Sequence, residues 1–465
     1  MKNKEITQRK TKILATLGPS SSTIKKIIEL SKAGANAFRL NCSHLNEKDL
    51  KEFVKKIRRA ETILKKPIGI LVDLQGPKIR LGTVKNDANY LKKGSPFLLD
   101  LKKDIGDHRR VTLPHKKIFS SVKKGHLILL DDGKIHLKVT SVKSTEIRTK
   151  VIQGGYLKSN KGVNFPETNI KTSALSSIDK KFANIAVQEG VDWIALSFVQ
   201  KPNDIKELRK ICSNKASIMA KIEKPTALDY IEDIASLADG IMIARGDLGV
   251  ELPIESVPGC QKKIIRVARV KGKPVVVSTQ MLESMTSSLT PTRAEVSDVA
   301  NAVFEGADAI MLSAESASGD YPIEAVKMMN KIAINIEKDS NYSDILSSQL
   351  EETPDTTPDA IATAAKTLAD ELSSPIIVCY TESGSTGIKV SRVRPSQIIL
   401  TITPVIQTAR KLSLAWGVLC FLQKDETDLE HMIQLTKKTV KRSGLAVIGD
   451  KVVITAGLPL KVQGT

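Results

Sequence analysis

Two acidic residues, Glu223 and Asp247, each follow a short apolar run of the sequence. If these runs form neighbouring parallel strands, the two carboxylates approach one another, and like charges at such a distance need a cation between them. Oxygen ligands with no His or Cys nearby suit Mg²⁺, or Mn²⁺, better than zinc. The pair therefore predicts a divalent metal site. The alternative is a salt bridge from Glu223 to Lys221 alone.

Basic residues accompany this acidic pair. Lys221 lies two residues before Glu223, so on a strand both side chains share one face. Arg39 and Arg80 add further donors. A lysine, arginines and a metal around one point neutralise a phosphoryl group during transfer, where catalysis is mostly positioning and charge. The sequence has no P-loop pattern and no kinase-type glycine-rich loop, so a nucleotide site here must follow another design.

Eight apolar, β-branched runs must position these residues, and they are typical of strands buried on both faces of a parallel sheet. Helical stretches lie between them, such as TIKKIIELSKA from Thr23 and TALDYIEDIASLAD from Thr226. This alternation predicts a (β/α)₈ TIM barrel, an α/β fold with its chemistry at the carboxyl ends of the strands. The runs begin at Lys12, Ala37, Ile68, Asp192, Ser217, Gly240, Pro274 and Ala309.

Polar residues gather where these runs end, and a barrel would bring them to one mouth. A single such residue is more often a solvated side chain leaving a strand, but the whole set indicates a site. Its members are Arg39, Asn41, Ser43, Asp73, Lys221, Glu223, Arg245, Asp247 and Thr279.

The third and fourth runs are unusually far apart, which indicates an insertion. Residues 74–166 read as short strands with turns, including a hairpin signal at Asp132 and Gly133. They contain 20 Lys or Arg and 7 Asp or Glu, which is +13 of the formal charge of +20. We expect a small, basic, all-β lid domain at 74–166, inserted into a barrel domain at 1–73 and 167–339.

A last domain is expected over residues 340–465. The stretch from Ser340 to Pro358 is rich in Ser, Thr, Asp and Pro, as linkers and surface loops are. Helices and strands then alternate, which predicts an open-sheet α/β domain of a regulatory type. The runs in question are PDAIATAAKTLADEL, PIIVCYTE, GIKVSRVR, QIILTIT and VVITAG.

The composition narrows the class of protein. The chain has no run of eighteen apolar residues, and its start lacks the apolar stretch of a secretory signal. We therefore expect a cytoplasmic location and no membrane contact. Five scattered cysteines without a CxxC pair predict reduced thiols. The positive charge favours anionic partners, but 4% aromatic residues and no recognisable nucleic-acid motif argue against nucleic acid.

Five segments resemble signatures of the pyruvate kinase family and occur in that family's order. They are RLNCSH from Arg39, DLQGPKIR from Asp73, AKIEKP from Ala220, ARGDLGVE from Ala244 and STQMLESM from Ser278. The start, the lid and the last domain also match, so the resemblance covers essentially the whole chain. It implies a Mg²⁺-dependent homotetramer that transfers a phosphoryl group from phosphoenolpyruvate to ADP, giving pyruvate and ATP.

The resemblance also implies roles at the mouth of the barrel. Arg39 would bind the substrate phosphate, Lys221 would stabilise the transferring phosphoryl group, and Glu223 with Asp247 would hold the divalent ion. The amides of Gly246 and Asp247 would bind the substrate carboxylate.

Further roles concern proton transfer and the nucleotide. Thr279, with Ser313, would belong to the relay that protonates the enolate of pyruvate. The nucleotide would be met by Asn41, Cys42, Ser43, His44, Arg80 and Lys161.

Most familiar members of the family need K⁺, held by residues that match Asn41, Ser43, Asp73 and the carbonyl of Leu74. Potassium-dependent relatives read DTKGPEIRT where this chain reads DLQGPKIRL, so Lys78 replaces an acidic residue. The pattern resembles the potassium-independent branch. The Lys78 ammonium would take the place of the cation beside Asp73, and we expect activity without K⁺.

In the last domain, TESGSTG joins a predicted strand to a helix, and hydroxyls with free amides at a helix start can bind an anion. The segment resembles the family's effector loop, with Thr381, Ser383, Ser385 and Thr386 as contacts. Glu382 stands where members that respond to sugar bisphosphates often have Lys, and it would repel a second phosphate. We expect a monophosphate effector, such as AMP or a sugar monophosphate, or none; an unregulated turn is the alternative.

Two other functions stay open on the residues alone. Another metal-dependent barrel acting on pyruvate or phosphoenolpyruvate, such as an aldolase-type enzyme, gives no reason for a basic lid with Lys161. A barrel retained as a binding or regulatory protein would not require the complete polar set at the mouth.

Overall fold

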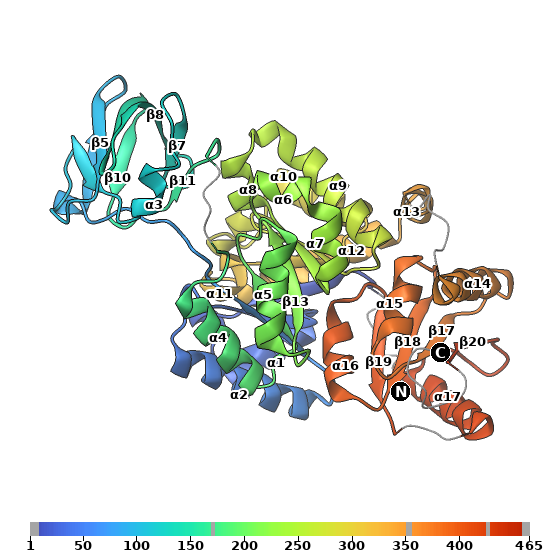
Figure 1. Ribbon diagram of the computed structural model, residues 1–465. Coiled ribbons are helices and arrows are strands. Elements are labelled where there is room, and N and C mark those ends of the chain that lie inside the picture. Colours follow the sequence, from blue (N-terminus) through green and yellow to red (C-terminus); the bar gives the residue numbers. More distant parts are fainter. Residues whose placement is uncertain (1–8, 169–172, 350–355, 425–427, 458–465) are drawn as a thin grey trace.

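The computed structural model describes residues 9–168, 173–349, 356–424 and 428–457. Eight parallel strands close into a barrel in the order β1-β16-β15-β14-β13-β12-β3-β2, which confirms the predicted (β/α)₈ fold (Figure 1). These strands are β1 Lys12–Thr16, β2 Ala37–Asn41, β3 Gly69–Asp73, β12 Trp193–Leu196, β13 Ser217–Ile222, β14 Gly240–Ala244, β15 Val275–Ser278 and β16 Ala309–Leu312.

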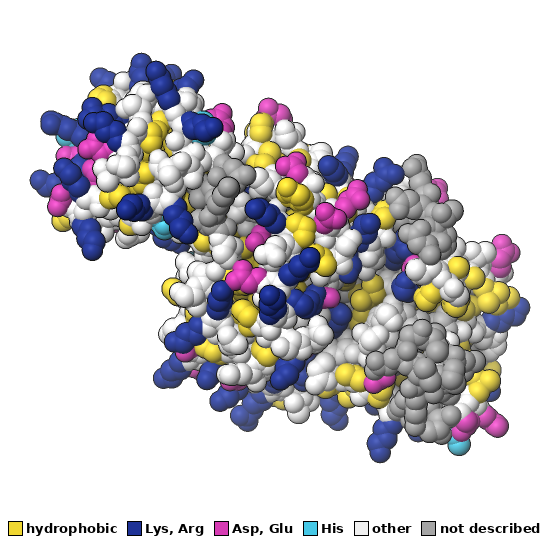
Figure 2. All heavy atoms as spheres, in the orientation of Figure 1, with side chains coloured by type: hydrophobic (Ala, Val, Ile, Leu, Met, Phe, Trp, Pro, Cys, Tyr) yellow, Lys and Arg dark blue, Asp and Glu magenta, His cyan; other side chains and the backbone are white. Residues whose placement is uncertain are grey.

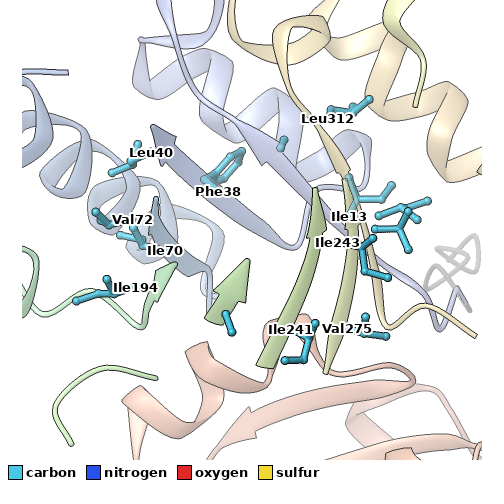
Figure 3. Close-up of a cluster of buried hydrophobic side chains, with 14 of the residues drawn as sticks. Ile13, Phe38, Leu40, Ile70, Val72, Ile194, Ile241, Ile243, Val275 and Leu312 are labelled. Atoms are coloured by element: carbon cyan, nitrogen blue, oxygen red, sulfur yellow. The ribbon is translucent and has the colours of Figure 1, made fainter. Parts of the chain in front are cut away.

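The strands are apolar on both faces because each face is buried. Leu71 and Met242 fill the barrel interior, whereas Ile70 and Ile243 pack outward against the helices (Figure 3). The predicted helix after Pro225 is broken at Tyr230 into two short helices. The surrounding helices include α1 Ile24–Ala33, α2 Glu47–Leu64, α4 Ser177–Gln188, α5 Pro202–Cys212, α6 Pro225–Asp229, α7 Ile231–Leu237, α9 Val257–Val270, α10 Arg293–Phe304 and α12 Pro322–Glu337.

The insertion forms a separate all-β lid with its own apolar core. It has a six-stranded sheet in the order β11-β7-β8-β9-β5-β6 and a two-stranded sheet β10-β4. The predicted hairpin is present, with positive φ at Asp131, Asp132 and Gly133. Many Lys and Arg side chains are spread around the edge of this lid, with hydrophobic and other side chains between them (Figure 2). Its elements are β4 Ala88–Leu91, β5 Pro96–Asp100, β6 Arg110–Thr112, α3 Lys116–Phe119, β7 Leu127–Leu130, β8 Ile135–Val142, β9 Glu146–Gln153, β10 Gly155–Lys158 and β11 Val163–Asn164.

The last domain is an open parallel sheet in the order β19-β18-β17-β20, as predicted for this α/β domain. The expected linker is partly helical, because Tyr342 and Leu346 of α13 are buried. The predicted boundaries of the three domains stay predictions. The elements are α13 Tyr342–Ser348, α14 Thr357–Glu371, β17 Ile376–Tyr380, α15 Ser385–Arg392, β18 Ile398–Thr403, α16 Ile406–Lys411, β19 Val418–Leu422, α17 Leu429–Ser443 and β20 Val453–Thr455.

The last domain is joined to the amino-terminal end of the barrel strands, opposite the lid (Figure 1). Trp416 is 1% exposed at this junction, and its amide donates to Asp308, which precedes β16. Its indole Nε1 donates to the Tyr342 hydroxyl at 3.2 Å. Lys10 and Arg394 lie 5.1 and 4.9 Å from the centre of its ring. Among the described helices, none is long and apolar enough to cross a membrane.

Trp416→Ala is expected to lower the free energy of unfolding by about 3–5 kcal/mol, because the variant leaves a cavity at this junction. Urea denaturation followed by circular dichroism measures the loss. Trp416→Phe is the control: it keeps a smaller aromatic ring and loses the hydrogen bond to Tyr342, so it should cost less, about 1–2 kcal/mol. Equal losses in both variants would mean that the ring does not join the two domains.

Candidate active site

The polar residues of the mouth continue the inward-facing register of the strands. Side chains alternate along a strand, so Asp73 shares its face with Leu71, and Lys221 shares its face with Met219. The apolar members of this register fill the barrel, and the polar ones lie at its carboxyl end. The fold itself therefore brings these residues together.

Asp73 is the centre of a buried charge network and is 1% exposed. One of its oxygens accepts from Nε and Nη2 of Arg39, both at 2.7 Å, and the other lies 3.1 Å from Lys221 Nζ. Burial by itself raises the pKa of Asp73, but the Lys221 ammonium and the Arg39 guanidinium hold that pKa below its ordinary value. Asp73 is therefore a carboxylate at neutral pH.

Lys221 lies between two carboxylates. Its Nζ is 2.9 Å from Glu223 Oε1 and donates to Ser197 Oγ at 2.7 Å. Burial works to lower the pKa of Lys221, but the carboxylates of Asp73 and Glu223 outweigh it and raise the pKa above its ordinary value. The side chain therefore carries a positive charge within a buried site.

Glu223 and Asp247 fit a divalent metal. Burial raises the pKa of Glu223, Lys221 lowers it, and the nearby charge of Asp247 raises it further, which a cation would relieve. Asp247 lies in the first turn of α8 (Arg245–Glu251), and Glu223 follows β13. No group of three or more His, Cys, Asp or Glu suited to a metal occurs in the described part of the chain. Two carboxylates suit Mg²⁺, which keeps several waters and completes its shell with substrate oxygens.

The start of α8 is hydrogen-bonded to Thr279. The Gly246 amide donates to Thr279 Oγ1 at 2.7 Å, and this hydroxyl donates to the Ser278 carbonyl at 2.6 Å. Thr279 has φ +70°, a left-handed conformation that is costly for a β-branched residue. Arg245 pairs with both oxygens of Asp298 at 2.6 Å and donates to the Thr279 carbonyl. Backbone strain is thus held at one wall of the mouth.

The expected nucleotide residues divide into two groups. In the barrel, the Cys42 amide donates to the Asp73 carbonyl at 2.9 Å, and the Ser43 amide donates to Asn41 Oδ1 at 3.1 Å. The Cys42 side chain is buried and burial raises the pKa of its thiol, while His44 is exposed.

The second group is held within the lid. Arg80 donates to the Asn160 carbonyl at 3.2 Å, and Lys161 pairs with Asp131 at 2.9 Å.

Lys78 lies in the cleft between the lid and the barrel. Its side chain runs beside Gly162, where an added Cβ would come within 3.3 Å of Lys78 Cε. The cations paired with Asp73 are Arg39 and Lys221. Lys78, Phe198, Lys224, Asp247 and Glu251 are among the residues that line this cleft, which has a volume of about 240 Å³.

The predicted effector loop is a tight turn before α15. Thr381 Oγ1 accepts from the Gly384 amide at 2.9 Å, and Ser383 Oγ donates to Ser385 Oγ at 3.2 Å. Ser385 begins α15, and Thr386 lies in its first turn.

Two site residues were not identified from the sequence, although both follow the inward register. Ser197 Oγ donates to the Leu74 carbonyl at 2.7 Å and accepts from Lys221, and Thr16 Oγ1 accepts from Arg39 Nη1 at 3.1 Å. Extending each strand by alternate residues would have found them. The Phe198 amide, which donates to Glu223 Oε2 at 2.7 Å, depends on a φ of +56° that no local pattern indicates.

The sequence matches two domain families. They are "Pyruvate kinase, barrel domain" over residues 8–326 and "Pyruvate kinase, alpha/beta domain" over residues 359–465. A pyruvate kinase of Methylorubrum extorquens is 50% identical over 98% of this chain and 95% of its own length. A pyruvate kinase of Geobacillus stearothermophilus is 39% identical over 98% of this chain and 79% of its own length. The crystal structure of a pyruvate kinase from Cryptosporidium parvum superimposes with a TM-score of 0.94 at 32% identity, covering 99% of this chain and 97% of that one. The chain belongs to the pyruvate kinase family.

Proposed function

We propose that this phosphotransferase moves the phosphoryl group of phosphoenolpyruvate to ADP, the last step of glycolysis, and that the mouth residues act as follows. One observation carries the proposal: the protonated, buried Lys221 is held between Asp73 and Glu223, next to Arg39. An incoming phosphate can replace these carboxylates as the partner of the two cations. An aldolase-type reaction has no use for such a pair.

Arg39 binds the phosphate of phosphoenolpyruvate, and Lys221 stays with the phosphoryl group during transfer. The bond from phosphorus to the enolate oxygen breaks, and a bond to the terminal phosphate oxygen of ADP forms. Negative charge on the transferring oxygens stays near the ammonium and guanidinium groups throughout, which lowers the barrier in a buried site.

Glu223 and Asp247 hold the divalent ion, Mg²⁺ or Mn²⁺. When bound, this ion supplies additional positive charge for the transferring phosphate. Glu223 would offer the ion a carboxylate that also pairs with Lys221 and accepts from the Phe198 amide, which fixes its position.

The amides of Gly246 and Asp247 bind the substrate carboxylate, and Thr279 belongs to the proton relay. The Gly246 amide at present donates to Thr279 Oγ1. When the substrate carboxylate accepts from this amide, Thr279 Oγ1 loses that hydrogen bond. The freed hydroxyl then orients a water molecule, which gives a proton to the enolate carbon to form pyruvate and takes up a proton from solvent in return. Ser313 suits the same relay, because its Oγ is buried without a hydrogen-bond partner among the described residues.

ADP is bound by both the barrel and the lid. In the barrel, Asn41 ends β2 and Cys42, Ser43 and His44 follow it, and the lid supplies Arg80 and Lys161. Lys161 would then exchange Asp131 for a nucleotide phosphate.

Lys78 replaces the monovalent cation. In the described conformation its ammonium is not paired with Asp73, so the exchange requires the side chain to turn toward Asn41, Ser43, Asp73 and the Leu74 carbonyl. In that position its charge would serve the phosphate site without K⁺.

The remaining proposals concern regulation and assembly. Thr381, Ser383, Ser385 and Thr386 form an effector loop for a monophosphate such as AMP or a sugar monophosphate, or serve no effector. The enzyme is a cytoplasmic homotetramer that binds neither nucleic acid nor membranes. Size-exclusion chromatography with light scattering tests the tetramer, and activity titrated with AMP and with a sugar monophosphate tests the loop.

The reaction is tested by measuring pyruvate release from phosphoenolpyruvate with Mg²⁺, with and without ADP. Release that depends on ADP and yields ATP supports the proposal. Pyruvate release without ADP, or no release under any ionic condition, would sink it.

Lys221→Ala is expected to lower kcat by about 10³-fold, because one preorganised charge at the transferring group is lost. Circular dichroism must show a retained fold, since the variant leaves Asp73 and Glu223 with less countercharge. Lys181→Ala, on the surface of α4, is the matched control and should keep full activity. A Lys221→Ala enzyme with kcat near the starting value would remove Lys221 from the mechanism.

The unchanged enzyme is expected to turn over in buffer free of K⁺ and NH₄⁺. Lys78→Glu should lower that rate about tenfold or more, and added K⁺ should restore it, because the carboxylate removes the built-in cation and supplies a ligand. Lys85→Glu makes the same charge change on the exposed lid surface and should show no K⁺ response. Strict K⁺ dependence of the unchanged enzyme would refute the role of Lys78.

A further inference from the structure

Glu251, the last residue of α8, is a buried carboxylate that joins the lid to the barrel. It is 5% exposed, and its Oε1 accepts from Asn164 Nδ2 of lid strand β11 at 2.7 Å. The same oxygen pairs with the ammonium of Lys224, which follows β13 in the barrel. One carboxylate oxygen therefore holds a group from the lid and a group from the barrel.

This contact bears directly on the helix that carries the active-site residues. Glu251 lies four residues after Asp247, so the two side chains share one face of α8, one turn apart. The tip of the β7–β8 hairpin approaches the same helix: a Cβ added at Gly133 would lie 3.9 Å from Val250 Cγ1. In Figure 1, β7 and β11 form the side of the lid that faces α8.

Lys224 connects the contact to the other wall of the mouth. It directly follows Glu223, and its Nζ lies 5.9 Å from the centre of the Phe198 ring. The Phe198 amide donates to Glu223 Oε2. Lys224 is therefore next in sequence to one expected metal ligand and paired with the helix that carries the other.

We propose that Asn164, Glu251 and Lys224 form a latch that holds the lid against α8 at the edge of the mouth and fixes the position of α8. The proposal rests on the proposed function, because the position of the lid matters through Arg80 and Lys161, which the lid carries to ADP. Glu251 is a positioning residue. A buried carboxylate needs its hydrogen-bond donors, so a movement of the lid that takes Asn164 away from Glu251 is disfavoured.

The test exchanges the amide and the carboxylate between positions 164 and 251. Asn164→Asp sets a carboxylate against Glu251 with little change in volume, and should raise KM for ADP about tenfold with kcat nearly unchanged, because the lid carries part of the proposed nucleotide site. Glu251→Gln keeps an acceptor for Asn164 and loses the charge that pairs with Lys224, so it should raise KM less, by about threefold. The double variant restores one amide and one carboxylate, with Lys224 still in reach, so KM should return to within about threefold of the starting value.

Hydrogen–deuterium exchange gives a readout that does not need turnover. Asn164→Asp should increase exchange in β11 and α8, and the double variant should reverse the increase. Asn89→Asp is the matched control: it makes the same change on β4, in the two-stranded sheet of the lid, and should alter neither KM nor exchange at α8. If Asn164→Asp does not fold, Asn164→Ala replaces it and should raise KM and exchange in the same direction.

Two results would overturn the latch. One is unchanged exchange and unchanged KM for ADP in both Asn164 variants. The other is a double variant whose defect equals the product of the two single defects, which is the result for independent structural damage. If the unchanged enzyme shows no ADP-dependent pyruvate release, the proposed function fails, and the exchange data still report on the latch.

Discussion

The structure of the mouth depends on the pairing of two buried cations with two buried anions. Arg39 and Lys221 neutralise Asp73 and Glu223 at positions where a lone charge would be strongly disfavoured. The pairing lowers the pKa of Asp73 and raises that of Lys221, which keeps these two groups ionised, and it holds all four side chains in place. In the proposed reaction a substrate phosphate would enter this site by exchanging partners, so its binding energy would be reduced by the internal pairs that it breaks. Moderate binding of the ground state leaves more of the interaction for the transition state.

The barrel supplies this network through register alone. Alternate residues of β2, β3 and β13 fill the interior with apolar groups and end in polar ones at the carboxyl side. One slip of register would turn Asp73 or Lys221 toward the helices and break the network. The apolar layers of the barrel interior and the charged layer at the carboxyl ends of the strands therefore follow from the same alternation of side chains.

Much of this could be predicted from the sequence, because the signals are local. Each of these signals depends on residues that are close together in the sequence: the eight apolar runs, the polar residues after them and the hairpin at Asp132. The contacts of Asn164 with Glu251 and of Trp416 with Asp308 join residues far apart in the chain, and neither has a local signature. The helix α13 was missed because its composition is that of a linker and its stability comes from burying Tyr342 and Leu346. The rotamer of Lys78 likewise depends on its surroundings in space.

The position of the junction at Trp416 affects which parts of such a protein can vary independently during evolution. The lid enters between β3 and β12 at one end of the barrel, and the last domain packs against the opposite end, so the two additions share no barrel surface around the mouth. Either addition can be lengthened or exchanged while the strand ends of the other stay as they are. A lineage can therefore remodel the last domain while the residues at the mouth of the barrel are inherited unaltered.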